Sequence, residues 1–212
     1  MSAIDMAIKE MVRILGKQGS SMIKSCDEVK QAIIKNSIGA AASSLASGFL
    51  PGVGATVATA ISVGFIWRMY YQINQTLGIS VSKNILKSVA SALLTNLLTG
   101  LGAILFADIA ATVLSLIPGL GSFSAAALVG AANYGLVYVS GLIYIKMLTG
   151  LFKAKKDISF MSPDEIATYM KTTLDENKDE IKEEFKEAKK SAVKDIKSGK
   201  ITKDDSFDAE KE

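Results

Sequence analysis

The chain has 212 residues, enough for one or two small domains, and its 24 Lys and Arg residues nearly balance its 21 Asp and Glu residues. A net charge of only +3 gives no reason to expect a nucleic-acid partner, and the absence of histidine excludes His-based triads and the common zinc sites. The single cysteine, Cys26, excludes an intramolecular disulfide and favours a cytosolic or cytosol-facing protein. The first residues hold no uninterrupted apolar run, so a secretory signal peptide is not expected.

Residues 1–35 are expected to form an amphipathic N-terminal helix, weakened near its middle by Gly16 and Gly19. Apolar residues recur in this segment at helical spacing: Ile4, Ile8, Met11, Leu15, Met22, Cys26, Val29 and Ile33. Such a helix either packs on the rest of the protein or lies in a membrane interface. The sequence leaves both interpretations open.

Residues 36–150 are expected to form an apolar domain of two tandem helical hairpins, with repeat units at about 36–78 and 83–148. The stretch FLPGVGATVATAISVGF at 49–65 matches LIPGLGSFSAAALVGAA at 116–132. In each unit a PGxG turn is expected to separate two helices. The turn residues are Pro51, Gly52, Gly54, Pro118, Gly119 and Gly121.

The helices around these turns have predictable ends. The second helix of the first unit should continue to about Leu77, because RMYYQINQTL contains no breaker, and Gly78 suits its end. The first helix of the second unit is expected over 83–117, where Asp108 is the only charge after the two lysines at its start. A carboxylate in a long apolar helix is costly, so Asp108 is a candidate intramembrane polar site. The alternative places it near a helix end or a buried polar neighbour.

The distribution of charge favours a membrane. Residues 36–67 carry no charge, and the uncharged run 122–145 exceeds the roughly 20 residues that cross a bilayer. If both hairpins enter from one side, every charged segment and both termini lie on the cytoplasmic face, as the positive-inside bias expects. The residues expected at the membrane interface are Trp67, Arg68, Tyr70, Tyr71, Tyr144 and Lys146.

A soluble bundle that hides two Ala-rich hairpins is the alternative. The helix expected at 36–50 is only about 22 Å long and is rich in Ala, Ser and Gly. The first hairpin could therefore be re-entrant or packed in a protein core. Small residues at four-residue spacing are expected to pack helices closely, within a hairpin or between protomers. They are Gly39, Ser43, Ser47, Ser122, Ala126 and Gly130.

Residues 151–198 are expected to form a charged helical tail, and 199–212 a disordered terminus. Together they contain 14 Lys residues and 16 Asp and Glu residues. Ser162, Pro163 and the acids after them predict a helix start. A thin apolar stripe, interrupted at Asn177, predicts a solvated helix with one packed face.

No motif for catalysis or cofactor binding occurs in the sequence. It has no GxxxxGK[ST], GxGxxG, CxxC, HExxH or GxSxG, and Cys26 has no histidine to activate it. We therefore expect a non-enzymatic protein that uses no cofactor and no metal.

The residues around the two turns resemble the YcjF-type domain of unknown function over about residues 36–148. Leu116-Ile-Pro-Gly-Leu-Gly-Ser and the Ala/Gly-rich helix after it are similar to the C-terminal half of that domain. Its earlier part is matched by Pro51-Gly52, Arg68-Met69 and Leu77-Gly78-Ile79. The resemblance implies membrane-associated helical hairpins, often attached to or encoded beside small GTPases of the Era or dynamin-like kind. The chain departs from the fused form because it has no GTPase domain, which leaves open whether a GTPase acts on it in trans.

Three functions fit these features. The leading hypothesis is a non-enzymatic membrane anchor or membrane-shaping scaffold that binds lipid, self-associates as a homo-oligomer and works with the GTPase partner that the resemblance implies. A pore-forming protein of the colicin-like kind is the first alternative. The second is a soluble helical module that binds lipid or a hydrophobic ligand between its hairpins.

Overall fold

The chain is helical throughout the part that the computed structural model describes, so the predicted all-α class is confirmed. The described residues are 2–16, 19–47, 54–100 and 122–209, with the backbone alone described at 54–59, 100 and 122–125. The α-helices are α1 Ala3–Ile14, α2 Gly19–Ser47, α3 Gly54–Leu77, α4 Lys83–Gly100, α6 Ser122–Lys153, α7 Pro163–Glu176 and α8 Lys178–Lys197. Two short 3-10 helices are η1 Ile158–Phe160 and η2 Lys203–Asp205.

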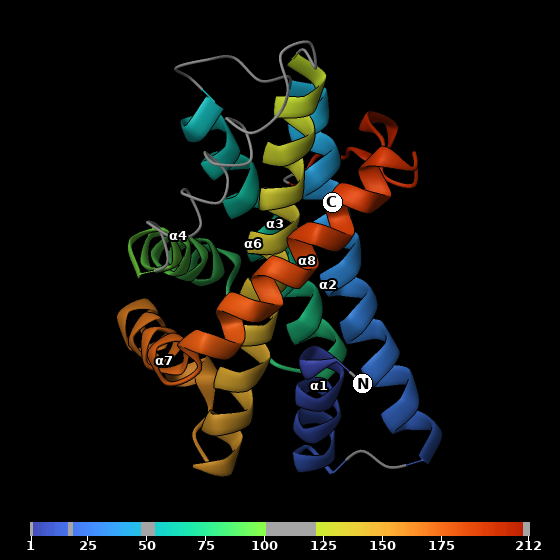
Figure 1. Ribbon diagram of the computed structural model, residues 1–212. Coiled ribbons are helices and arrows are strands. Elements are labelled where there is room, and N and C mark those ends of the chain that lie inside the picture. The colour runs from blue at the N-terminus through green and yellow to red at the C-terminus, as the bar shows by residue number, and fades with distance from the viewer. Residues whose placement is uncertain (1, 17–18, 48–53, 101–121, 210–212) are drawn as a thin grey trace.

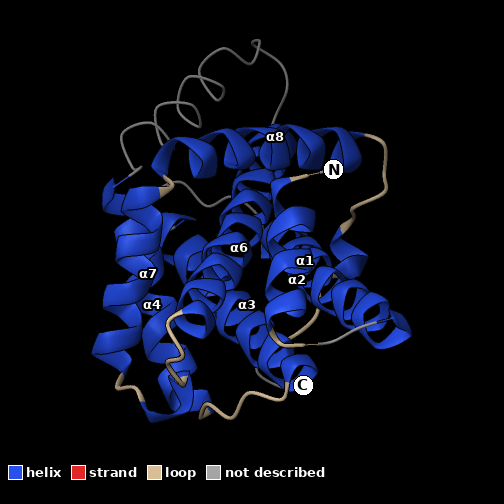
Figure 2. Ribbon diagram, turned by 90° about the horizontal axis from the view of Figure 1, so that it is seen from below, coloured by secondary structure: helices blue, strands red, loops and turns tan. Residues whose placement is uncertain are grey.

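Helix α6 is the centre of this bundle. It contacts every other α-helix among the described residues. In Figure 1, α8 runs obliquely across the face of α6, with α2 beside it. Figure 2 shows α8 from a second direction as a layer at one side of the bundle. The most apolar helix is therefore enclosed by the more polar ones.

The N-terminal segment differs from the expected single helix, because it forms α1 and α2. A capping box between Ser2 and Asp5 starts α1. The chain then reverses through Gly16 and Gly19, whose φ values of +72° and +58° strain any residue with a side chain. The next helix, α2, runs for 29 residues across the boundary expected at residue 36. No breaker lies there, so the leading helix of the first hairpin is longer than 36–50.

The two turns remain predictions. Helix α3 begins at Gly54 and ends at Leu77, as predicted, and Gly78 follows with a left-handed φ of +75°. Helix α4 covers the first part of the helix expected at 83–117. The predicted residues that lie outside the described part are Pro51, Gly52, Asp108, Pro118, Gly119 and Gly121.

The charged tail packs more extensively than expected. Ser162 and Glu165 form a capping box, and Pro163 is the first residue of α7. Asn177 separates α7 from α8, where the apolar stripe was interrupted. Helix α8 buries Ile181, Phe185, Ala188, Ala192 and Ile196. Residues 199–209 are ordered and include the buried Ile201 and Ala209, whereas disorder was expected there.

Candidate functional site

The strongest functional feature of the described structure is α6 with the helices that cover it. Within the part of the chain that is described, α6 supplies the one helix, Ala126–Lys153, that is long and apolar enough to cross a membrane. In the most apolar stretch of this helix, 72% of the residues are buried inside the protein. The core helix of a water-soluble protein has the same length and composition, so the contacts of α6 carry the functional argument.

Three glycines let other helices approach α6 closely. A Cβ at Gly130 would lie 3.0 Å from the backbone oxygen of Ala41 in α2. A Cβ at Gly135 would lie 2.8 Å from the ring of Phe185 in α8, and one at Gly141 would lie 2.9 Å from Ile33. Real Cβ atoms do not approach other atoms below about 3 Å, so a side chain at Gly135 or Gly141 would push its neighbour away. Glycine at these positions fixes where α2 and α8 lie.

A buried polar layer joins α2, α3 and α6. Asn133 donates from Nδ2 to Ser44 Oγ at 2.6 Å, and its Oδ1 accepts from Ser62 Oγ at 3.0 Å. Ser44 in turn donates to the backbone oxygen of Ala40 at 2.7 Å. All three side chains are at most 3% exposed. Because a buried polar group without a partner is costly, the layer specifies how these helices align.

A second polar layer contains two stacked tyrosines. The rings of Tyr70 and Tyr144 lie 4.0 Å apart and are inclined by 15°. Tyr70 donates its hydroxyl to the backbone oxygen of Ser140 at 3.2 Å, and Tyr144 donates to Asn74 Oδ1 at 2.8 Å. Both tyrosines are fully buried. This layer connects α3 with α6 through groups that find their partners inside the protein.

Two of the four aromatic residues expected at a membrane interface, Trp67 and Tyr71, pack against lysines of the protein. Trp67 is 4% exposed, and its ring lies 4.7 Å from Lys87 Nζ. Tyr71 lies 4.8 Å from Lys83 Nζ, so both contacts attach the end of α3 to the start of α4. Tyr70 and Tyr144 lie in the core, as described above. A location in a membrane interface remains a prediction for all of these residues.

Arg68 and Lys146, the two cations expected at the membrane interface, both form hydrogen bonds within the protein. Arg68 is 3% exposed and donates from Nη1 to Asn36 Oδ1 at 3.2 Å. Lys146 donates to Asn177 Oδ1 at 2.8 Å and to Glu180 Oε2 at 2.7 Å, so it holds the start of α8 on α6. The sequence predicted a membrane-interface position for both residues and did not identify their partners within the protein.

The small residues predicted to pack helices closely differ in how much they contribute to helix contacts. Gly130 lies against α2, and Gly39 is buried beneath Phe65 of α3 and Phe207 of the tail. Ala126 is 7% exposed. Ser43 is half-buried, and the exposed Ser47 donates to the backbone oxygen of Ser44 at 3.1 Å. Ser122 is the first residue of α6. The close contacts seen are intramolecular, and self-association stays a prediction.

In the described residues no three Cys, Asp or Glu side chains converge on a position for a metal ion. Burial raises the pKa of the Cys26 thiol, with Asp27 adding to the effect, so the thiol is a poor nucleophile at neutral pH. A half-open groove of about 540 Å³ lies between α1, α2, α6 and α8 and includes Tyr134 and Glu184 in its lining.

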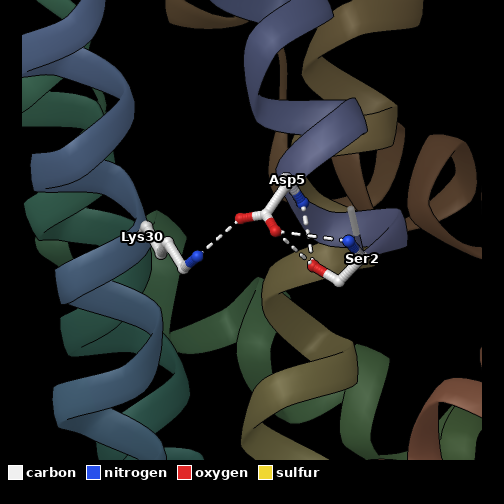
Figure 3. A network of polar contacts seen from close by, with 3 residues as sticks. All are labelled: Ser2, Asp5 and Lys30. Atoms are coloured by element: carbon white, nitrogen blue, oxygen red, sulfur yellow. Dashed lines mark hydrogen bonds and ion pairs between the residues drawn. The ribbon is translucent and has the colours of Figure 1, made fainter.

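Asp5, Lys30 and Ser2 form a polar cluster in this groove (Figure 3). Lys30 Nζ lies 2.7 Å from Asp5 Oδ1, and the second oxygen of Asp5 accepts from the Ser2 hydroxyl at 2.9 Å. The hydrogen bond from Lys30, and then that from Ser2, holds the pKa of Asp5 below its usual value of 3.8. The cluster therefore fixes the start of α1 on α2.

Acid should weaken this attachment. Because the pKa of Asp5 is lower in the folded chain, its contribution to the free energy of unfolding is complete above about pH 4 and is lost as the pH falls through the depressed pKa. We expect Asp5→Asn to destabilise the protein at neutral pH and to cost progressively less in acid. Urea unfolding of both proteins between about pH 7 and pH 2.5 measures this difference. A difference that is constant with pH would contradict it.

Comparisons with known proteins give no family for this chain. No protein-family model matches it, and neither the curated proteins nor the solved structures include a significant match.

Proposed function

We propose that this chain is a non-enzymatic, membrane-associating helical bundle that holds the apolar helix α6 inside the protein and presents it to a lipid bilayer when α8 moves away. One observation carries the proposal: two helices of opposite character lie directly against each other. Helix α6 has no charged residue from Ser122 to Ile145, whereas 13 of the 20 residues of α8 are charged. A helix like α8 stays in water, and a helix like α6 is stable in hydrocarbon.

The polar layers support insertion of α6 together with its neighbours. Alone in a bilayer, α6 would carry Asn133 without a partner, which is costly in hydrocarbon. With α2 and α3, the hydrogen bonds to Ser44 and Ser62 are kept. Residues 36–67 are uncharged, so the parts of α2 and α3 next to this layer add no charge to the inserted group.

The proposed role is an anchor or membrane-shaping scaffold. Both termini lie on the cytoplasmic side when the helix expected at 83–117 crosses the bilayer as well, because an odd number of crossings would place them on opposite sides. The charged helices α7 and α8 then remain in water, where they recruit or regulate a partner. A GTPase acting in trans is the partner that the resemblance to YcjF-type domains implies. Self-association in the membrane would use the same small residues that now admit α2 and α8, because close helix packing in lipid depends on such residues.

Vesicle flotation with the full chain tests the proposal. The protein should float with phosphatidylglycerol-containing vesicles in the absence of detergent, and the fraction that floats should rise when the packing of α8 is weakened. Protein that stays in the soluble fraction with every vesicle composition would exclude the membrane role. Flotation with intact vesicles would support the anchor.

A pore-forming function is the second candidate, and the enclosure of α6 by amphipathic helices favours it. Pore-forming proteins of the colicin-like kind keep apolar helices within such a shell. Self-quenched carboxyfluorescein trapped in the vesicles separates the two functions. Release of the dye at protein concentrations that saturate flotation would favour a pore over an anchor.

A further inference from the structure

The last described residues of the chain fold back onto α2 and α3. Gly199 takes a left-handed φ of +74° after α8, and the backbone N–H of Lys200 donates to the oxygen of Asp195 at 2.9 Å. These contacts reverse the chain and lead it toward α2, which η2 contacts. Ile201 is 4% exposed and packs among alanines that include Ala41 and Ala131. We call residues 200–209 the C-terminal segment.

Phe207 packs against a surface of α2 and α3 that we call the seat. Its residues around the ring are Lys35, Gly39, Phe65 and Arg68. The ring of Phe207 meets the ring of Phe65 edge-on, with centroids 5.0 Å apart. The guanidinium of Arg68 lies 4.6 Å from the same ring, and Lys35 Nζ lies 5.6 Å from it, both within the range of a cation–π interaction. A Cβ at Gly39 would come within 2.5 Å of the ring, so this glycine makes the room that Phe207 fills.

The C-terminal segment contacts α3 at two alternate positions, Phe207 and Ala209. Ser206 has extended backbone angles, with φ −71° and ψ 141°. Ala209, two positions after Phe207, is 7% exposed, and a Cβ at Gly64 of α3 would lie 3.5 Å from its side chain. Alternate residues of an extended chain face the same way, so an extended peptide with a phenylalanine and a small residue at this spacing would place both against this surface.

Charge is complementary between the seat and the segment. Lys35 and Arg68 are the cations beside the ring. The residues 203–208 read KDDSFD and contain three aspartates against one lysine. An apolar peptide would match the ring contacts alone, whereas an acidic segment that carries a phenylalanine matches both the ring contacts and the charge.

We propose that this seat is a recognition site for an extended acidic segment with the pattern Phe-x-small, that the C-terminal segment is its ligand in cis, and that the same segment of a second copy binds it in trans. The cis segment is tethered to α8, so its effective concentration is on the order of millimolar and it competes with any segment added from outside. Binding of the C-terminal segment of one copy to the seat of another becomes favourable at high protein concentration.

A binding measurement without lipid tests this inference independently of the membrane role. A fluorescein-labelled peptide of residues 199–209 is titrated with the full chain and with full-length Phe207→Ala, and its fluorescence polarisation is followed. We expect Phe207→Ala to bind the peptide at least about tenfold more tightly than the unaltered chain, because its own segment competes less well. A peptide in which alanine replaces the phenylalanine should not bind. Absence of binding to Phe207→Ala, or equal binding of both peptides, would overturn the proposal.

Limited trypsin digestion provides a second measurement that needs no added peptide. Cleavage after Lys200 and Lys203 should be about tenfold faster in Phe207→Ala than in the unaltered chain, since release of Phe207 exposes the backbone of the segment. Phe160→Ala is the matched control, because Phe160 is 89% exposed and its loss should leave the rate unchanged. Equal cleavage rates in all three proteins would contradict the seat as the anchor of the segment.

Discussion

Replacing Phe185 with alanine is expected to lower the free energy of unfolding by about 3–5 kcal/mol, the range for truncating a buried aromatic side chain. Phe185 is 1% exposed, and its ring occupies the space that Gly135 leaves open on α6. The substitution removes the largest side chain that α8 buries in the core and leaves a cavity between the two helices. Urea unfolding of full-length protein, followed by circular dichroism, measures the loss.

The same substitution connects stability to the proposed function. If α8 shields α6 from lipid, weakening their contact should raise the fraction of protein that floats with vesicles under conditions where the variant is still folded. Phe160→Ala again serves as the control, because an exposed phenylalanine should change the free energy of unfolding by no more than about 0.5 kcal/mol. If the Phe185→Ala protein is destabilised but floats no better than the control, the packing of α8 does not control membrane association.

Local chemistry in the sequence predicted the helix ends well. Gly78 identifies the end of α3, and Ser162 with Pro163 identifies the start of α7, because capping depends on residues within a few positions of each other. The two glycines at 16 and 19 were recognised as a weakness, but not as the complete break that their left-handed φ values make. A glycine in a helical pattern costs about 1 kcal/mol, which tertiary contacts can outweigh or exploit.

The partners of the helices could not be predicted in the same way. The apolar stripe of α8 indicates that one face is buried, but not that it packs on α6 instead of on lipid or another protein. Lys146 looked like a flanking charge for a membrane span, and its contacts with Asn177 and Glu180 depend on residues more than 30 positions away. Long-range contacts of this kind leave no local pattern in the sequence.

The C-terminal segment shows that amino-acid composition alone did not predict whether this part of the chain folds. Residues 199–212 are rich in charge, so they were expected to be disordered. Phe207 and Ala209 nonetheless find a prepared surface on α2 and α3. A single aromatic residue in a charged stretch was the available signal. Its meaning depended on Gly39, which lies far away in the sequence and was interpreted as a site for helix packing.

Asn133 gives the second large prediction. Replacing it with leucine, which has nearly the same shape, should lower the free energy of unfolding by about 1–3 kcal/mol, because Ser44 and Ser62 lose their hydrogen-bond partner in the core. Adding Ser62→Ala in the Asn133→Leu protein should cost less than Ser62→Ala alone, since the hydroxyl then has no amide left to bind. A double-mutant cycle from urea unfolding gives the coupling, for which about 0.5–3 kcal/mol is expected. Additive effects would show that the layer does not act as a unit.

The same cycle bears on how α6 could enter a bilayer. In water the protein loses stability when Asn133 becomes leucine, but in hydrocarbon the leucine favours α6 as an isolated span. If α6 inserts alone, Asn133→Leu should therefore increase vesicle flotation beyond what its destabilisation explains, as judged against Ser62→Ala. If α2, α3 and α6 insert together, both substitutions disrupt the same interaction, and flotation should follow the loss of stability in both proteins. The polar layer thus distinguishes a single inserted helix from an inserted group of three.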